Sequence, residues 1–180
     1  MQLIRKSQDR TTLATELFTH FKEHLRILHN HEDDSIMLYL VSALDAIATY
    51  GGNDVFLAEY DVFYPRGGYE YKSPSDMYGW FCGKYDISDL TVINSAGIDK
   101  TADYTIDAQF GVVYPHPLDN KINFKAGYLG VDDMPPRLVN IVFRLGADYM
   151  ENRESTRVGE PKLLPDWIKY SLASIWKPRV

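Results

Sequence analysis

The spacing of apolar residues changes twice along this chain, and these changes restrict its fold more than any other feature. Steps of three and four residues dominate up to residue 52, strict alternation dominates in residues 53–134, and the longer steps then return. The longer steps place apolar side chains on one face of a helix, and alternation places them on one face of a strand. We therefore predict an α+β fold, mainly a helical bundle of residues 1–52 and 135–180, with a small antiparallel β-domain inserted as residues 53–134. The whole chain, residues 1–180, is interpreted as a single domain.

Two helices are predicted before residue 53. The first covers residues 11–28, and its apolar stripe consists of Leu13, Leu17, Phe18, Phe21, Leu25 and Leu28. A polar loop follows, Asp34 or Ser35 caps the second helix, and Gly51 and Gly52 end it. The expected core stripe of the second helix consists of Ile36, Leu40, Ala43, Leu44 and Ile47.

Short strands are predicted in the middle of the chain. In residues 55–64 the side chains of Phe56, Ala58, Tyr60 and Val62 share one face, and Glu59 and Asp61 share the other. Further strands are expected at residues 90–93, 104–107, 111–114 and 121–128.

Two more helices are predicted at the end of the chain. Pro135 and Pro136 begin a third helix with the apolar residues Leu138, Ile141, Val142, Leu145 and Tyr149. A polar loop containing Gly159 and Pro161 follows. Pro165 begins a last short helix, which Pro178 ends and which carries Trp167, Ile168, Leu172 and Ile175.

The charge and the apolar content exclude several classes of protein. The chain has 19 Lys and Arg against 25 Asp and Glu, for a net charge of −6. This balance argues against a protein whose affinity comes from neutralising phosphates, although it does not exclude one that lets DNA slide past. No apolar run approaches the roughly 20 residues needed to span a bilayer, so we expect no membrane interaction. The N-terminal residues lack the apolar core of a signal peptide, which predicts synthesis in the cytoplasm.

The sequence offers weak candidates for catalysis. Cys82 is the only cysteine, which excludes an intramolecular disulfide and a Cys-rich zinc site. Glu59 and Asp61 share one face of a strand, as a glycosidase pair would, but paired carboxylates are also ordinary on exposed strands. Residues 66–68 form one Arg-Gly-Gly turn, which a loop tip explains better than RNA binding.

Histidines and acids near the first loop are the candidates for a metal site. His20 and His24 lie four residues apart on the first helix, and the loop could add His29, His31, Glu32, Asp33 and Asp34. A small metal-dependent hydrolase using these residues is the alternative function. A solvated helix face followed by a capping loop explains the same pattern, so we expect no catalytic residue, no cofactor and no metal.

The end of the chain has the composition of a docking segment. An apolar ring beside basic residues has little reason to lie in a frayed tail, although it could also cap the core. The predicted docking residues are Ile175, Trp176, Lys177, Pro178, Arg179 and Val180. We expect the loop with Gly159 and Pro161 to release the last helix from the bundle.

Several of these segments together resemble the head–tail connector family of tailed bacteriophages, the adaptors that complete the head beneath the portal. The N-terminal resemblance covers residues 22–26 and continues through the acidic loop into residues 33–52. The C-terminal resemblance consists of Lys125-Ala126-Gly127-Tyr128, Met134-Pro135-Pro136-Arg137-Leu138, Tyr149-Met150-Glu151-Asn152-Arg153-Glu154 and the Leu164-Pro165 helix that ends at Pro178-Arg179-Val180. The segment of residues 66–84 lies outside the resemblance.

The resemblance implies a structural ring protein that is not an enzyme. Such a ring contains about twelve identical subunits, each with two different complementary faces. It binds the portal protein on one side and a stopper or tail-completion protein on the other, and it extends the channel through which double-stranded DNA passes without specific binding. A net acidic charge suits this role, because a lining that attracted phosphates would slow the DNA. The implied location is the head–tail interface of the virion, and the predicted docking segment would bind the portal.

Overall fold

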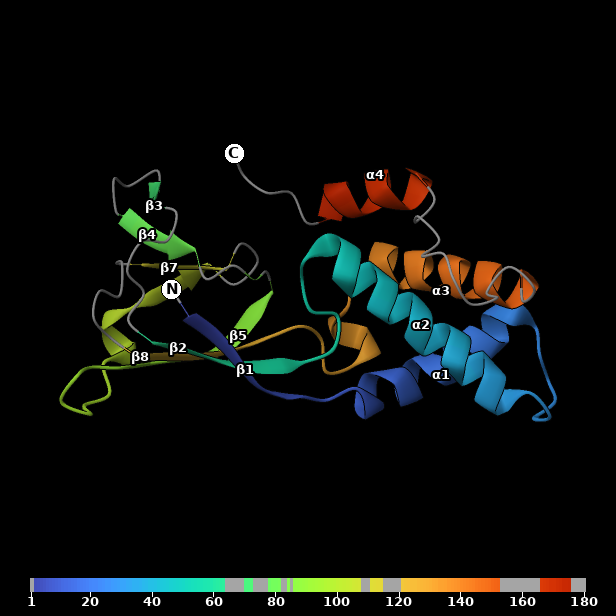
Figure 1. Cartoon of the computed structure of the whole chain (residues 1–180), viewed down its shortest axis with the longest axis horizontal. Coiled ribbons are helices and arrows are strands. Elements are labelled where there is room, and N and C mark those ends of the chain that lie inside the picture. The colour runs from blue at the N-terminus through green and yellow to red at the C-terminus, as the bar shows by residue number, and fades with distance from the viewer. Residues whose placement is uncertain are drawn as a thin grey trace. The chain divides into compact units, whose positions relative to one another are not determined.

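The chain divides into two compact units. The computed structural model describes residues 2–63, 70–72, 78–81, 84, 86–107, 111–114, 121–152 and 166–175. One unit, here called the β unit, consists of Met1–Asp9 and Phe56–Gly127, and the other, the helical unit, consists of Arg10–Val55 and Tyr128–Val180. Figure 1 shows the strands gathered in one unit and the α-helices in the other. The predicted α+β class is confirmed.

The first sheet of the β unit has four antiparallel strands in the order β1-β2-β8-β5. The strands are β1 (Gln2–Gln8), β2 (Ala58–Phe63), β8 (Lys121–Ala126) and β5 (Ile87–Ile93). Burial alternates along β8, where Ile122, Phe124 and Ala126 are buried and the Lys and Asn residues between them are partly exposed. The predicted alternation of this strand is therefore confirmed.

A second sheet has the order β3-β4-β7-β6. Its strands are β3 (Glu70–Lys72), β4 (Tyr78–Phe81), β7 (Val112–Tyr114) and β6 (Thr105–Asp107), and the 3-10 helix η1 (Thr101–Asp103) precedes β6. Val113 of this sheet joins the core of the first one. That core contains Ala58, Tyr60, Val62, Ile87, Val113, Ile122, Phe124 and Ala126. Burying these side chains is the main favourable contribution to the stability of the unit.

The helical unit consists of α1 (Thr11–Leu25), α2 (Asp33–Gly51), the 3-10 helix η2 (Val131–Asp133), α3 (Pro136–Glu151) and α4 (Asp166–Ile175). Helix α2 packs against α1, α3 and α4. The five predicted core residues of α2 are all fully buried, as are Leu13, Leu17 and Phe21 of α1. Four of the five residues predicted for α3 are buried: Leu138, Ile141, Val142 and Leu145.

A glycine allows close packing between α1 and α3. A Cβ atom at Gly146 would lie 2.7 Å from Cζ of Phe21, whose ring is fully buried. The Phe21 ring also lies 5.5 Å from that of Phe143, measured between centroids. Only a residue without a side chain at position 146 leaves room for this ring.

The structure corrects the prediction that residues 1–52 are helical. Residues 2–8 form the edge strand β1, in which Gln8 pairs with Ala58 and Leu3 with Val62. Strands β3 and β4 were also not predicted. The β part is therefore larger than expected, and "mainly a helical bundle" does not describe the fold.

Helix boundaries differ from the prediction at two points. Helix α1 ends at Leu25 because Arg26 adopts a left-handed conformation, with φ at 57°, so Leu28 lies outside the helix and is 98% exposed. Helix α2 begins at Asp33, with Glu32 as the N-cap residue in place of Asp34 or Ser35. Its end at Gly51, followed by Gly52 in the left-handed conformation, agrees with the prediction.

Backbone hydrogen bonds hold the segments where the chain passes from one unit to the other. Within the β unit, the amide of Asp9 donates to the carbonyl of Leu57 at 2.9 Å, and within the helical unit the amide of Tyr128 donates to the carbonyl of Val55 at 3.0 Å. Gly127 has φ at +97°, and a Cβ atom there would lie 2.4 Å from the carbonyl oxygen of Phe56. Glycine is therefore required at position 127 for two reasons, its backbone conformation and this close approach.

None of the helices in the described part of the chain is both long enough and apolar enough to cross a membrane.

Candidate assembly surfaces

Helix α4 is docked on the helical unit. Ile168 is fully buried and Leu172 is 2% exposed, where α4 packs against α2 and α3. The Arg144 guanidinium of α3 lies over the half-buried ring of Trp167, with its central carbon 4.2 Å from the ring centroid. The expectation that the last helix is released from the bundle is thus wrong for the described residues 166–175, because two aliphatic side chains and one cation–π contact hold it.

The predicted docking segment begins where α4 ends. Ile175 is the last residue of α4 and is half-buried. The other five predicted docking residues, Trp176, Lys177, Pro178, Arg179 and Val180, lie outside the described residues, so their docking role stays a prediction.

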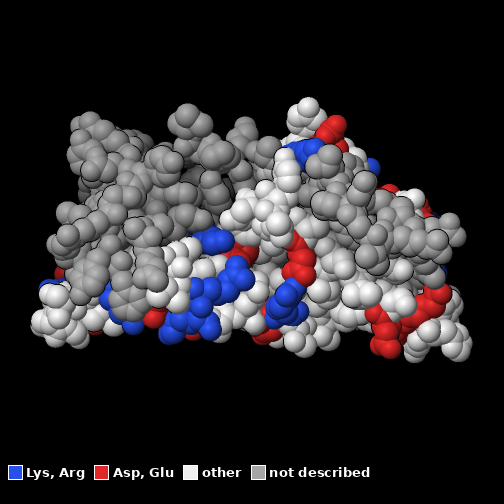
Figure 2. All heavy atoms as spheres, in the orientation of Figure 1, with Lys and Arg blue, Asp and Glu red and all other residues white. Residues whose placement is uncertain are grey.

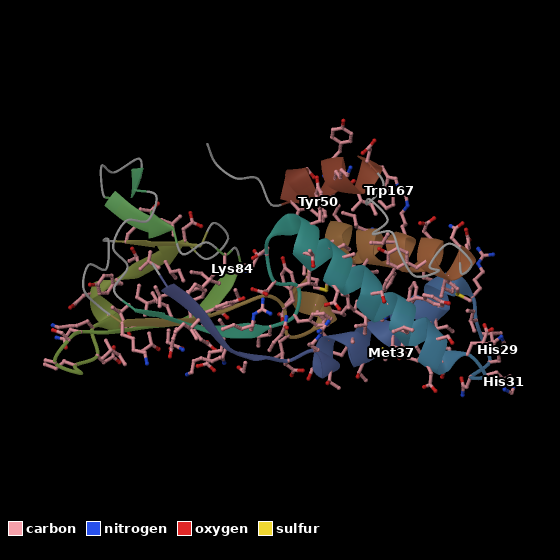
Figure 3. The ribbon with its side chains drawn as sticks, viewed as in Figure 1. His29, His31, Met37, Tyr50, Lys84 and Trp167 are labelled. Atoms are coloured by element: carbon pink, nitrogen blue, oxygen red, sulfur yellow. The ribbon has the colours of Figure 1, made fainter. Side chains whose placement is uncertain are left out.

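Exposed tyrosines lie on α4 and near the end of α2. Tyr170 is 78% exposed and Tyr50, near the end of α2, is 48% exposed. The Lys169 ammonium donates to Asp166 Oδ1 at 3.0 Å, and this bond, more than the influence of Tyr50 and Tyr170, raises the pKa of Lys169. Figure 3 shows Tyr50 beside α4, at the end of that helix opposite to Trp167.

The outward side of α2 carries a leucine beside acids. Leu38 is two residues from both Ile36 and Leu40, which is roughly 200° around the helix, so it lies opposite the buried stripe. It is 63% exposed. Asp34, one turn earlier, is also exposed, and Asp45, two turns later, forms an ion pair with Arg10.

The loop between α1 and α2 is organised by one lysine. The Lys22 ammonium donates to the His29 carbonyl at 2.9 Å, to Asn30 Oδ1 at 2.8 Å and to Asp33 Oδ1 at 2.6 Å. The side chain of Lys22 is only 14% exposed, so this charge is shielded from solvent and satisfied by the loop. Asp33 therefore neutralises a lysine and orders the loop.

The structure does not gather the candidate metal ligands into one site. The His29 and His31 rings lie 5.7 Å apart at the loop, measured between centroids. The His24 ring lies 5.5 Å from that of Phe143 of α3, and His20 Nδ1 lies 3.7 Å from Glu23 Oε2. Figure 3 shows His29 and His31 together at the tip of the α1–α2 connection. Within the described ranges, no group of three or more His, Cys, Asp or Glu side chains is placed to hold a metal ion.

The two carboxylates of β2 belong to a network of lysines and an amide. Lys6 donates to Glu59 at 2.8 Å, Lys121 lies 3.3 Å from Asp61, and the Asn123 amide donates to both carboxylates, at 2.9 Å to Glu59 and 3.0 Å to Asp61. The hydrogen bond from Lys6 lowers the pKa of Glu59. Partial burial pushes the pKa of Asp61 up, but the bonds from Asn123 and Lys121 outweigh it, so this pKa is also lowered.

These lowered pKa values do not suit acid catalysis. A general acid must keep its proton near neutral pH, which requires a raised pKa. Glu59 and Asp61 instead remain charged and connect β1, β2 and β8 on the polar face of the first sheet.

Charges of both signs are distributed over the surface. On the face shown in Figure 2, the described part carries Lys and Arg in small groups beside Asp and Glu, with uncharged side chains between them. The other candidates from the sequence, residues 66–68 and Cys82, lie outside the described residues.

Two of these surface features were missed in the sequence. Leu38 could have been found, because the helical repeat that identifies the core stripe of α2 also places Leu38 opposite it. The position of Tyr50 beside α4 follows from the packing of α4 on α2, and no local pattern indicates it.

Solved structures of gene transfer agent particles share this fold. A chain in the neck of an empty particle, computed with C6 symmetry, is 19% identical with a TM-score of 0.61, and a chain in the virion of a native particle is 18% identical with a TM-score of 0.60. A chain in the neck of a native particle, computed with C12 symmetry, is 17% identical with a TM-score of 0.63. Each match covers 100% of this chain and 97% of the other.

The chain has the fold of these particle proteins. Each of the three matches extends over both units. No protein-family model matches the sequence, and no curated protein matches it.

Proposed function

We propose that this protein is a structural subunit of the head–tail connector ring of a tailed phage-like particle. The observation that carries the proposal is the likeness in fold along the whole chain to proteins of gene transfer agent particles, two of them described as neck structures. The sequence resemblance to phage head–tail connectors is independent support, because its segments lie in both the N-terminal and the C-terminal parts of the chain.

In this role the subunit forms a closed ring of about twelve copies, as a head-to-tail contact between identical subunits allows. The C12 symmetry of one of the similar neck structures agrees with that number. The ring joins the portal protein to a stopper or tail-completion protein, and it extends the channel through which double-stranded DNA passes. The net charge of −6 supports a channel that does not retain DNA, because phosphates are not attracted to it.

The portal contact is proposed for Ile175 and the five residues after it. Since α4 is docked, the attachment would extend from a fixed helix. Identical segments around a ring would bind together, so that a weak contact in each copy gives firm attachment. The protein acts at the head–tail interface of the virion, after synthesis in the host cytoplasm, and it acts without catalysis.

The experiment is complementation of particles that lack this protein. Heads without it are imaged by electron microscopy and then incubated with the purified wild-type protein or with a variant that lacks residues 176–180. We expect the wild type to add a ring beneath the portal and the truncated protein to stay folded but unattached. A control variant with Lys177→Ala and Arg179→Ala retains the apolar residues and tests the charges alone.

Two results would contradict the proposal. If heads without the protein already carry a complete neck, the connector role is wrong. If the truncated protein attaches as well as the wild type, the connector role stands and the docking surface lies elsewhere.

A further inference from the structure

The loop between α1 and α2 has an uncharged tip with one fully exposed leucine. This tip, here called the Leu28 tip, contains no Lys, Arg, Asp or Glu and consists of Ile27, Leu28, His29, Asn30 and His31. Leu28 is 98% exposed, more than any other large apolar residue in the described part of the chain, and the three residues after it are exposed too. Charged residues stand on both sides of the tip, Arg26 before it and Glu32 after it. An uncharged centre with an apolar anchor and a charged border has the composition of a protein interface.

Hydrogen bonds hold the backbone on both sides of Leu28. The amide of Ile27 donates to the Lys22 carbonyl at 3.1 Å, where the chain turns out of α1. The ammonium group of the same lysine donates to the His29 carbonyl at 2.9 Å and to Asn30 Oδ1 at 2.8 Å. A side chain that is presented by an ordered backbone loses less conformational freedom when it binds. The Leu28 tip is therefore ordered in advance for binding a partner.

The Leu28 tip and the start of the proposed portal-docking segment lie at opposite ends of α2. The tip comes just before α2 and so lies at its N-terminal end, where Figure 3 shows His29 and His31. Tyr50, at the C-terminal end of α2, lies beside the end of α4 opposite to Trp167, and this is the end formed by Ile175 (Figure 3). The 19 residues of α2 span roughly 28 Å. A portal bound next to Ile175 therefore leaves the tip free for another partner.

We propose that the Leu28 tip binds the neck component on the side of the ring away from the portal, the stopper or tail-completion protein. Leu28 inserts into an apolar pocket of that protein, and the exposed polar groups of the tip form hydrogen bonds at the border of the pocket. The inference rests on the proposed connector function, which requires a second attachment surface on every subunit, and it assigns that surface. The identical tips of a ring bind together, so a small contact in each copy gives firm attachment.

A charge at position 28 tests this assignment in assembled particles. Cells that produce the particles are supplied with Leu28→Asp in place of the wild-type protein, and the particles are imaged by electron microscopy. Because Leu28 is exposed, the variant is expected to keep the melting temperature of the wild type and to add its ring to the portal. The next neck component is expected to be missing, and tailed particles should fall about tenfold or more, as when an interface anchor is lost.

Three control variants separate the leucine from its surroundings. Leu28→Met keeps an apolar side chain of similar volume and is expected to give normal numbers of tailed particles. His29→Gln combined with His31→Gln keeps the tip uncharged and is expected to do the same. Leu38→Asp places the same charge on another exposed leucine of the helical unit, and its rings should still bind the next component. If Leu28→Asp gives normal tailed particles, or if any control loses the next component as completely, the assignment is wrong.

The stage at which assembly stops identifies other partners of the tip. If Leu28→Asp prevents the ring from forming on the portal, the tip contacts the portal or a second copy of this chain, and the assignment is wrong. A photo-reactive group on Leu28→Cys, in a chain with Cys82→Ser, gives an independent result in purified particles. The expected cross-linked protein is the component that Leu28→Asp particles lack. Cross-links to the portal or to a second copy overturn the proposal.

This inference and the connector role can fail separately. If wild-type protein adds a ring to heads but Leu28→Asp particles carry a complete neck, the Leu28 tip is wrong and the connector role stands. If heads without the protein already carry a complete neck, the connector role itself fails.

Discussion

The Arg144 guanidinium and the Trp167 ring join α3 to α4 through a contact of 4.2 Å between the guanidinium carbon and the ring centroid. Arg144 is otherwise exposed on α3, whereas Trp167 is half-buried at the start of α4. An arginine that covers an indole ring shields it from water and attracts its π electrons. This pair therefore helps to hold α4 in the position from which the proposed docking segment extends.

Replacing Arg144 tests the contribution of this contact. We expect Arg144→Ala to lower the free energy of unfolding by about 0.5–2 kcal/mol, because a cation–π contact at a partly exposed site is lost. Urea denaturation followed by tryptophan fluorescence measures the change. Arg144→Lys keeps the charge and should lose less, and a stability of Arg144→Ala equal to the wild type would show that the contact is not formed in solution.

A core substitution tests the buried face of α3. Leu145 is fully buried, so Leu145→Ala should cost about 2–5 kcal/mol through the lost apolar contacts and the cavity left behind. Leu129 is 49% exposed, and Leu129→Ala is the matched control, with an expected cost below about 0.5 kcal/mol. Similar costs for both variants in chemical denaturation would mean that the α3 face is assigned incorrectly.

Alanine substitutions at two glycines with positive φ distinguish the cost of backbone strain from the cost of a steric clash. Gly127 and Gly97 have φ at +97° and +78°, but a Cβ atom meets the Phe56 carbonyl at position 127 and has nothing within 4 Å at position 97. Gly97→Ala should therefore cost only the strain of a left-handed alanine, about 1 kcal/mol. Gly127→Ala should cost clearly more. Equal melting temperatures of the two variants would argue against the close approach of residue 127 to Phe56.

The carboxylates of β2 predict a dependence of stability on pH. The pKa values of Glu59 and Asp61 are lowered in the folded protein. In the unfolded chain these pKa values are about 4.3 and 3.9. The two carboxylates therefore stabilise the fold fully above the unfolded values, and this contribution is lost as the pH falls through the folded values. Asp61→Asn removes one of these groups and should lose less stability than the wild type between neutral pH and about pH 3. Parallel pH profiles of the two proteins would show that Asp61 does not contribute.

Chelation distinguishes the structural role from the alternative of a metal-dependent hydrolase. We expect EDTA to leave the melting temperature unchanged, and the combined replacement of His20, His24, His29 and His31 by Gln to leave particle assembly almost unchanged. Elemental analysis of the purified protein provides an independent measurement. Stoichiometric zinc together with lower stability after chelation would support a metal site instead.

Periodic segments were predicted well, and segments that depend on distant partners were not. The core stripe of α2 and the alternation of β8 follow from residue spacing alone, and both are confirmed. Strand β1 was missed because its residues, Gln2–Gln8, lack clear alternation and pair with a strand from much later in the sequence. Leu28 was assigned to α1 because it continues the spacing, but the left-handed conformation of Arg26 ends the helix first.

For the candidate sites, the sequence identified individual residues but not the side chains that contact them. The Glu59 and Asp61 pair was recognised, yet Lys6, Lys121 and Asn123, which keep both carboxylates charged, come from two other strands. Lys22 likewise reaches the loop from within α1. These partners depend on tertiary contacts, which residue spacing does not contain.

The pairing of β1 with β2 has a consequence for the order in which the protein folds. Gln8 must meet Ala58, so the chain between them, which contains both α1 and α2, has to form a closed loop before β1 gains a hydrogen bond. Closing so long a loop costs conformational entropy, whereas α1 and α2 are built from local contacts. During synthesis, the residues of β1 leave the ribosome before those of β2 and therefore wait for a partner while the two helices between these strands form. Strand β1 is made before these helices and is incorporated into its sheet after them.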